Sequence, residues 1–374
     1  MRVALFLFAF TLTAQAQWTI QPQATTADLR GIDSVGKGIA WASGTNGTVL
    51  RTEDGGYLWQ KCTVPPGAEK LDFRGIQAFD ENTAIVMSSG KGDLSRLYKT
   101  TDGCQSWKLV LTNQDTDGFW DAVKALGPDD FEVAGDSVDH ILVSEKKGHI
   151  LPVWELHEGD DLADNFTDHF FELTSDLKEG GFAASNSTLV IGERPHRDPT
   201  WSYQWLATGN DNHSYIHREA VEETKTCEPC RMESLRIETP MSQGTASAGI
   251  FSLSFREDRV GIAVGGDYQR SASTVKTAIY SGDSGKTWAL ANTPPHGYRS
   301  AVAYDAASKT WITVGPNGTD ISTDDGRNWR ALKPGPGDAP DADQHWNALS
   351  LPFVVGPKGR IGLLNDDALK AAAK

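Results

Sequence analysis

The sequence predicts an all-β fold, a seven-bladed β-propeller of four-stranded antiparallel blades in which the N-terminal strand completes the last blade. Three observations predict it: one turn motif occurs four times, similar strand openings recur about every 45 residues, and the last repeat is one strand short. Repeats of roughly 40 to 50 residues with strand–turn–strand character are typical of propellers. We expect a single domain over residues 17–364 and a C-terminal tail over residues 365–374.

The first sixteen residues are expected to be a secretory signal peptide. Arg2 precedes an apolar run over residues 3–10, and an Ala-x-Ala pattern follows at residues 14–16. This order is typical of a signal peptide, cleaved here before Gln17, and the run is too short for a membrane span of ~20 residues. We therefore predict an exported protein, periplasmic or extracellular, that does not insert into a membrane.

The turn motif follows the pattern Ser/Thr-x-Asp-x-Gly-x-Thr-Trp. A short Asp side chain accepts backbone N–H bonds in a tight turn, and Gly provides the positive φ that such a turn requires. We expect the Trp to pack between neighbouring sheets, so we interpret the motif as structural, with calcium binding as the alternative. The four copies contain Asp54 and Trp59, Asp102 and Trp107, Asp283 and Trp288, and Asp324 and Trp329, and Cys104 replaces the Gly of the second copy.

The strand openings indicate where each blade begins. We expect innermost strands near residues 29, 73, 119, 181, 250 and 298, and a seventh near residue 345 whose blade ends at Leu364. Residues 18–21 begin with Trp18, which resembles a motif Trp, and they would supply the strand that the last blade lacks. Closure of this kind removes the open sheet edges that invite aggregation.

Blades three and four are expected to depart from the repeat. Blade three lacks the turn motif and is followed by an acidic connection over residues 156–181. Blade four has a longer loop with Cys227 and Cys230, which we expect to form a structural disulfide. A redox site is the alternative, because Cys-x-x-Cys spacing lowers a thiol pKa. Cys62 and Cys104 lie on neighbouring blades, and the sequence leaves open whether they pair.

Composition excludes several classes of protein. The chain has 50 Asp and Glu against 35 Lys and Arg, a net charge of −15, whereas a general nucleic-acid binder needs a basic excess. Apolar residues make up 39% and there are 12 Trp, too many for a disordered chain. The dinucleotide, nucleophile-elbow and His-Glu-x-x-His motifs are absent from the sequence, so we expect neither a cofactor nor a metal.

The candidate binding residues lie on the innermost strands. Arg30, Arg74 and Arg299 occupy the same strand position in blades one, two and six, and Asn347 occupies it in blade seven. These four blades are consecutive in a closed ring, and Asp121 lies on the inner strand of blade three. Because Arg binds carboxylates and phosphates in a bidentate manner, we hypothesise a ligand- or partner-binding arc on the channel rim. The alternative is that each Arg pairs with a local acid.

The turn motif resembles the Asp-box, or BNR repeat, of sialidase-like propellers, where it is structural. Residues 95–103 and 244–253 are similar to exported bacterial propellers of the photosystem II stability/assembly factor family. This resemblance implies seven blades and an arginine patch that binds assembly partners, for which Arg30, Arg74 and Arg299 are the candidates. Similar bacterial sequences are often labelled oxidoreductase, but the sequence contains no cofactor motif that supports this label.

The expected function is that of a non-catalytic scaffold. It would bind a protein partner or a small anionic ligand or glycan, as an assembly or stability factor, and we expect a monomer. One alternative is a sialidase-like hydrolase, which needs a Tyr nucleophile paired with Glu and an Asp acid. Tyr298 and Asp121 lie on the inner-strand arc, but the sequence marks no Tyr–Glu pair. The other alternative is a redox protein that uses the Cys227–Cys230 loop.

Overall fold

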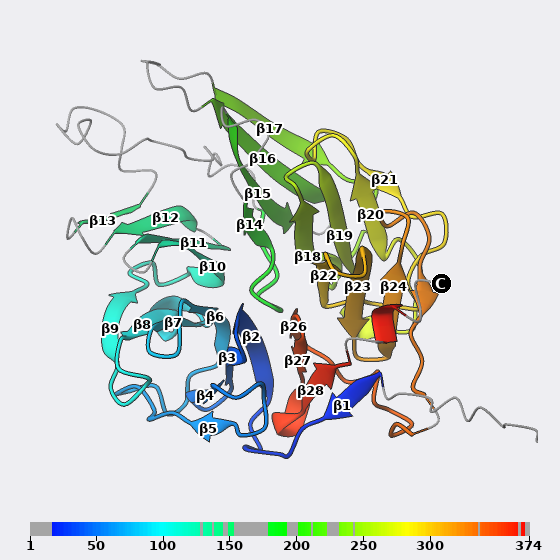
Figure 1. Ribbon diagram of the computed structural model, residues 1–374. Coiled ribbons are helices and arrows are strands. Elements are labelled where there is room, and N and C mark those ends of the chain that lie inside the picture. Colours follow the sequence, from blue (N-terminus) through cyan, green and yellow to red (C-terminus); the bar gives the residue numbers. More distant parts are fainter. Residues whose placement is uncertain are drawn as a thin grey trace, which may run out of the picture.

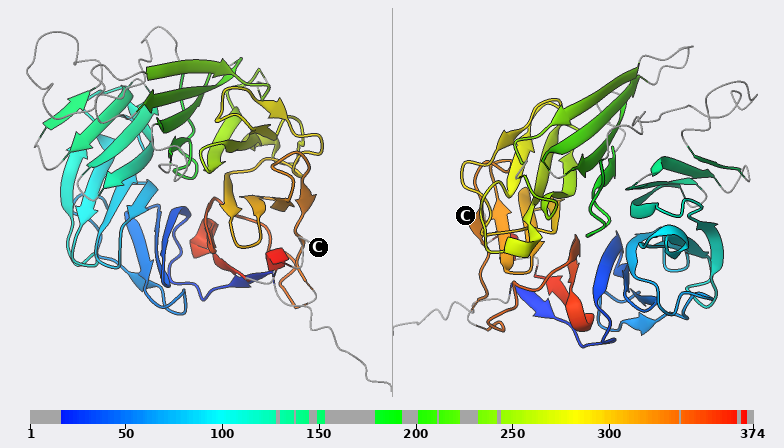
Figure 2. Two further views of the ribbon diagram at one scale, coloured as in Figure 1. Left: turned by 45° about the horizontal axis from the view of Figure 1, so that its top comes forward. Right: turned by 180° about the vertical axis from the view of Figure 1, so that it is seen from behind.

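The computed structural model describes most of the chain as a ring of β-sheets. The described residues are 17–127, 130–136, 138–144, 149–152, 179–192, 201–210, 212–222, 232–241, 244–335, 337–365 and 368–370. They form seven four-stranded antiparallel sheets around a central channel, each following the last in chain order (Figures 1 and 2). The predicted seven-bladed propeller is therefore confirmed.

The first four blades run from the innermost strand outwards along the chain. Blade one contains β2 (Leu29–Gly36), β3 (Ile39–Gly44), β4 (Thr48–Thr52) and β5 (Gln60–Lys61). Blade two contains β6 (Phe73–Ala78), β7 (Ala84–Ser88), β8 (Arg96–Thr100) and β9 (Lys108–Thr112). Blade three contains β10 (Phe119–Gly127), β11 (Asp130–Asp136), β12 (Val138–Ser144) and β13 (His149–Pro152). Blade four contains β14 (Leu189–Ile191), β15 (Trp201–Gly209), β16 (Ser214–Glu222) and β17 (Met232–Glu238).

The remaining blades complete the ring. Blade five contains β18 (Ala248–Arg256), β19 (Val260–Asp267), β20 (Ala278–Ser281) and β21 (Ala289–Leu290). Blade six contains β22 (Ala301–Asp305), β23 (Thr310–Gly315), β24 (Gly318–Ser322) and β25 (Arg330–Ala331). Blade seven contains β26 (Ala348–Ser350), β27 (Phe353–Val355), β28 (Ile361–Leu364) and β1 (Trp18–Ile20). Short 3-10 helices η1 (Gly92–Leu94), η4 (Tyr268–Arg270) and η5 (Pro357–Gly359) lie in connections.

The N-terminal strand closes the ring as predicted. β1 pairs antiparallel with β28, with Trp18 opposite Leu364 and Ile20 opposite Gly362. The Trp18 ring is buried 5.9 Å from the ring of Trp346. Ala368 and Leu369, beyond the last strand, are buried in the same apolar cluster, so the start of the expected tail packs onto blade seven.

Apolar side chains hold neighbouring blades together. Trp41 and Val49 of blade one share a cluster with Phe73 and Val86 of blade two. Trp59 of blade one lies edge-on to Phe353 of blade seven, with ring centroids 5.5 Å apart. Because each sheet buries its faces against both neighbours, the core is a series of layers around the ring.

Each Asp-box aspartate holds its own turn by hydrogen bonds. In the first copy, Asp54 Oδ1 accepts from Thr52 Oγ1 at 2.9 Å and from the Leu58 N–H at 3.0 Å. These bonds favour the ionised form and hold the pKa of Asp54 below its usual range. The same pair of bonds recurs at Asp102, Asp283 and Asp324.

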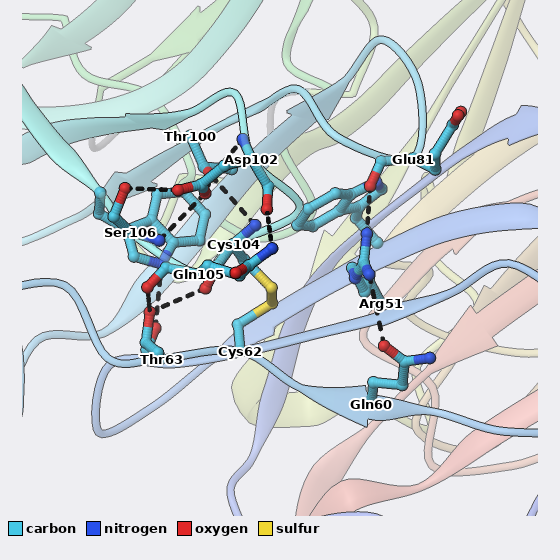
Figure 3. Close-up of a disulfide and its surroundings, with 12 residues drawn as sticks. Arg51, Gln60, Cys62, Thr63, Glu81, Thr100, Asp102, Cys104, Gln105 and Ser106 are labelled. Carbon is cyan, nitrogen blue, oxygen red and sulfur yellow. Dashed lines mark hydrogen bonds between the residues drawn. A yellow bond between two sulfur atoms is a disulfide. The ribbon is translucent and has the colours of Figure 1, made fainter.

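The Gly position of the Asp-box faces the preceding blade. A Cβ built on Gly56 would lie 2.8 Å from Phe353 Cε1, and one built on Gly326 would lie 2.2 Å from Ile262 Cδ1. Cys104 occupies this position in blade two with φ +62° and forms a disulfide with Cys62 of blade one (Figure 3). The pairing that the sequence left open is therefore present.

Candidate functional site

The first two candidate arginines come together at one end of the channel. Arg30 and Arg74 are the second residues of β2 and β6, so neighbouring blades place them at the same height. Asp72 lies between them: its Oδ1 is 3.5 Å from Arg30 Nε, and its Oδ2 accepts from Arg74 Nε at 2.9 Å. The two arginine side chains are 32% and 31% exposed. We call Arg30 and Arg74 the arginine pair.

A segment between blades three and four enters the channel beside the arginine pair. We call residues 180–188 the channel segment, and Figure 1 shows it as the loop that precedes β14 at the centre of the ring. The Ala183 carbonyl accepts from Arg74 Nη1 at 3.2 Å. Asn186 Oδ1 accepts from the Val123 N–H of blade three at 2.8 Å, and its Nδ2 donates to the Ile76 carbonyl of blade two at 3.2 Å.

The channel segment also reaches the opposite side of the ring. Ser185 Oγ donates to the Ser300 carbonyl at 2.8 Å, and Ser187 Oγ donates to Ser252 Oγ of blade five at 2.8 Å. The segment therefore spans the channel, and β14 begins at Leu189 rather than near residue 181. The sequence did not indicate this role. The run of small and polar residues from Ala183 to Thr188 is the signal that could have indicated it.

Asp121 takes the strand position of Arg30 in blade three and is buried against the channel segment. Its side chain is buried, and both burial and the charge of Asp136 raise the pKa of Asp121 well above the usual range. Asp136 Oδ1 accepts from the Gly181 N–H at 2.7 Å. A Cβ on Gly181 would lie 2.6 Å from Asp121 Oδ2, and one on Gly180 would lie 2.6 Å from Asp136 Oδ1. Asp121 therefore belongs to the packing beneath the arginine pair.

Arg299 does not join the arginine pair, and the prediction that it shares their strand position is wrong. A Cβ on Gly44 would meet Leu29 and one on Gly315 would meet Arg299, so Arg299 takes the position of Leu29, one residue before that of Arg30.

The Arg299 guanidinium is fully buried, Nε donates to Asp320 Oδ2 at 2.9 Å, and Nη1 donates to the Tyr298 carbonyl at 2.8 Å. Asp320 also contacts His296, with Oδ1 2.6 Å from the ring Nδ1. Arg299 thus follows the alternative in which an inner-strand arginine pairs with a local acid.

Asn347 has a connecting role beside Arg30. Its Nδ2 donates to the Leu29 carbonyl at 2.8 Å, which joins blade seven to the first residue of β2. Tyr298 packs edge-on against Phe251 with ring centroids 4.7 Å apart. Burial raises the pKa of Tyr298 far above its usual range, which disfavours the ionised form that a nucleophile would need.

The candidate catalytic and metal sites receive no support from the described residues. Within them, no group of three or more His, Cys, Asp or Glu side chains is placed to hold a metal ion. Cys227 and Cys230 lie outside the described residues, so the redox alternative stays a prediction. None of the helices in the described part of the chain has the length and apolar character that a membrane span requires.

Comparison with known proteins agrees with this architecture. Residues 11–151 match the family model "Photosynthesis system II assembly factor YCF48". The structure of YCF48 bound to D1 peptide shares 15% identity and a TM-score of 0.57, covering 94% of this chain and 97% of that chain. YCF48 from Cyanidioschyzon merolae shares 17% identity and a TM-score of 0.57, covering 94% of this chain and 100% of that chain. No curated protein sequence matches.

Proposed function

We propose that this YCF48-like BNR-repeat propeller is an exported, non-catalytic assembly or stability factor that binds an acidic segment of a protein partner on the rim of the channel. The family match over residues 11–151 supports a role in assembly. A YCF48 protein of the same fold has been solved with a bound D1 peptide, which supports a polypeptide as the ligand class.

The observation that carries the proposal is the arginine pair. Two guanidinium groups share the carboxylate of Asp72 on a chain whose net charge is −15. The buried Asp121 also interacts with Arg74, but burial raises the pKa of Asp121 and favours its neutral form. Within the described residues neither terminal nitrogen of Arg30, Nη1 or Nη2, forms a hydrogen bond, while the buried Nε faces Asp72. Because a guanidinium presents several donors in a fixed plane, the pair retains donors for a second, external carboxylate.

The channel segment determines how a partner approaches. It spans the channel between blades two, three, five and six, so a polypeptide would lie across the rim rather than thread through the ring. It also fixes Arg74, because Nη1 donates to the Ala183 carbonyl. A preorganised side chain loses less conformational entropy on binding, which favours affinity.

The Cys62–Cys104 disulfide supports export. Disulfides form and persist in oxidising compartments such as the bacterial periplasm and are rare in the cytosol. Together with the signal-peptide pattern of the first sixteen residues, the bond is consistent with a periplasmic or extracellular protein.

Partner capture tests the proposal. Mature protein is used as bait in a periplasmic extract of its native host, and captured proteins are identified by mass spectrometry. An acidic segment of the captured partner is then made as a peptide, and its Kd is measured by calorimetry. We expect the Arg30→Ala/Arg74→Ala variant to bind at least tenfold more weakly. Arg330→Ala, which removes an exposed arginine of β25, is the matched control. Unchanged binding by the double variant would contradict the proposal.

A further inference from the structure

A second candidate site is a pocket on blade seven. A pocket of about 360 Å³ opens between the end of β1, the short helix η5 and residue 345. Ile20 and Pro357 provide apolar surface, while His345, Lys358 and Arg360 provide basic groups. This volume is at the small end of the range for ligand pockets, which are mostly apolar with a few polar groups that fix orientation.

The pocket wall is held in place by hydrogen bonds to the connection between β1 and β2. The Gly359 N–H donates to the Ala27 carbonyl at 2.7 Å, and the Lys358 N–H donates to Asp28 Oδ1 at 2.9 Å. Gln23 Nε2 donates to the Lys358 carbonyl at 2.6 Å. Gly359 has φ +68°, and a Cβ there would lie 1.8 Å from the Thr25 carbonyl oxygen, so only Gly fits. The wall therefore exists before any ligand binds.

Lys358 is the basic side chain of the pocket that retains free donors. Within the described residues the Lys358 ammonium forms neither a hydrogen bond nor an ion pair, whereas Arg360 Nη1 lies 3.4 Å from Asp341 Oδ2 in an ion pair. The Arg360 guanidinium lies 4.9 Å from the Trp346 ring centroid, and its Nη2 donates to the Asp341 carbonyl at 2.7 Å. Asp341 and Asp28 lie nearby but do not line the pocket. The pocket itself thus favours an anionic group.

Hydrogen bonds tie the pocket wall to the start of β2, the strand that carries Arg30. The Leu29 N–H donates to the Gly356 carbonyl at 3.1 Å, which ties the start of β2 to the residue before η5. Asp28, which holds the Lys358 backbone, is two residues before Arg30, a distance of roughly 7 Å along an extended chain. An extended peptide a few residues long could therefore contact both places.

From these contacts we infer that the blade-seven pocket is a second recognition subsite for the polypeptide that the arginine pair binds, and that it takes an acidic residue together with an adjacent aliphatic one. The carboxylate meets Lys358 and Arg360, and the aliphatic side chain packs on Ile20 and Pro357. The inference rests on the proposed function, because it assumes that the arginine pair holds another carboxylate of the same polypeptide.

An array of fluorescein-labelled dodecapeptides tests the inference by fluorescence anisotropy. Each probe has a Gly/Ser background, one fixed Glu and one Leu-Glu pair at a varied distance from it. A matched set replaces Leu-Glu with Ser-Gln. We expect at least one Leu-Glu probe to bind wild type at least tenfold more tightly than its Ser-Gln counterpart. Binding of no Leu-Glu probe overturns the inference.

Variants separate the two sites. Lys358→Glu and Ile20→Ser should each weaken binding of the Leu-Glu probe, at least tenfold for Lys358→Glu. Binding of the Ser-Gln probe should stay unchanged in both variants. Lys37→Glu is the matched control, because Lys37 is also an exposed lysine with a left-handed backbone, φ +54° against φ +55° at Lys358. Circular dichroism melting curves verify that the variants fold.

The outcomes for the two sites are distinguishable. If Arg30→Ala/Arg74→Ala abolishes binding but Lys358→Glu and Ile20→Ser stay within twofold of wild type, the subsite inference is wrong and the proposed function stands. If Lys358→Glu weakens binding and the double arginine variant does not, the pocket binds the peptide by itself and the arginine-pair function is wrong.

Discussion

Cys104, at the Gly position of the second Asp-box, forms a disulfide with Cys62 at the outer edge of the preceding blade (Figure 3). In the first and fourth copies the corresponding Gly packs closely against an apolar side chain of the preceding blade. In blade two the Cys62–Cys104 bond therefore takes the place of the packing contact that Gly makes with the preceding blade in these other copies. The Thr63 side chain also joins this turn, because its Oγ1 donates to the Cys104 carbonyl at 2.8 Å.

Removal of this disulfide should lower the free energy of unfolding of the propeller. The bond links residues 42 positions apart, and a bond of this kind contributes about 2 to 4 kcal/mol to the free energy of unfolding. Urea unfolding should show this loss for Cys62→Ala/Cys104→Ala. The Cys62→Ala/Cys104→Gly variant should be more stable by about 0.5 to 1 kcal/mol, because Gly adopts φ +62° without strain. Equal stability of the two variants would contradict this account of the Gly position.

Substitution of Arg299 should mainly lower stability, whereas substitution of Arg74 should mainly weaken partner binding. Arg299→Ala leaves the buried Asp320 carboxylate without its main partner, and loss of one partner of a buried pair costs about 3 to 5 kcal/mol. Arg74 is about one-third exposed and shares Asp72 with Arg30, so Arg74→Ala should lower the free energy of unfolding by less than about 1 kcal/mol. Chemical denaturation and partner capture measure the two effects. Equal stability losses would mean that the two arginines have the same role.

The contrast between these arginines shows how far the sequence could predict the site. The ring, its closure and the Asp-boxes follow from local repeats, and all were predictable. The sequence aligns Arg30 with Arg299, but in the structure Arg299 comes one position earlier in its blade. The acid beside each arginine is supplied by another part of the chain, Asp72 before β6 and Asp320 in β24. Asn186 contacts residues 63 and 110 positions away in the chain, so no local pattern indicated that its segment spans the channel.

The attachment of the channel segment to blades two and three should depend on the Asn186 side chain. Its amide forms two hydrogen bonds to the buried backbones of blades two and three, and Asn186→Ala leaves both groups unsatisfied. Each lost bond to a buried group costs about 1 to 3 kcal/mol. We expect a lower free energy of unfolding and faster hydrogen exchange at the Val123 amide. Asn212→Ala, at an exposed turn, is the control and should change neither quantity.

A thiol count tests whether Cys227 and Cys230 form a structural disulfide. We predict a structural disulfide, so protein denatured without reductant should contain no reactive thiol, because Cys62 and Cys104 are already bonded. Reduction should then release four thiols, the number of Cys in the chain. A pair of reactive thiols in the oxidised preparation would favour the redox alternative.

Two buried acids between blades three and four should make stability depend on pH. Burial, with the neighbouring charge of Glu132, raises the pKa of Glu219 to about 8, and burial raises the pKa of Glu132 to about 7. Within the described residues neither Glu219 carboxylate oxygen has a hydrogen-bond partner, while Glu132 accepts from Gln204. The folded protein therefore favours the protonated form of both acids.

The sign of the effect follows from the folded and unfolded pKa values. An unfolded Glu has a pKa of about 4.3, so the contribution of Glu219 is fully present below that pH and is lost as the pH rises toward about 8. Glu219→Gln cannot ionise and should lose less stability over this interval, with a relative gain of up to about 1.4 kcal/mol for each pH unit of the rise. Urea unfolding at pH 5, 6.5 and 8 measures it. Glu69→Gln, at an exposed position, should follow wild type, and a Glu219→Gln curve parallel to wild type would contradict the assignment.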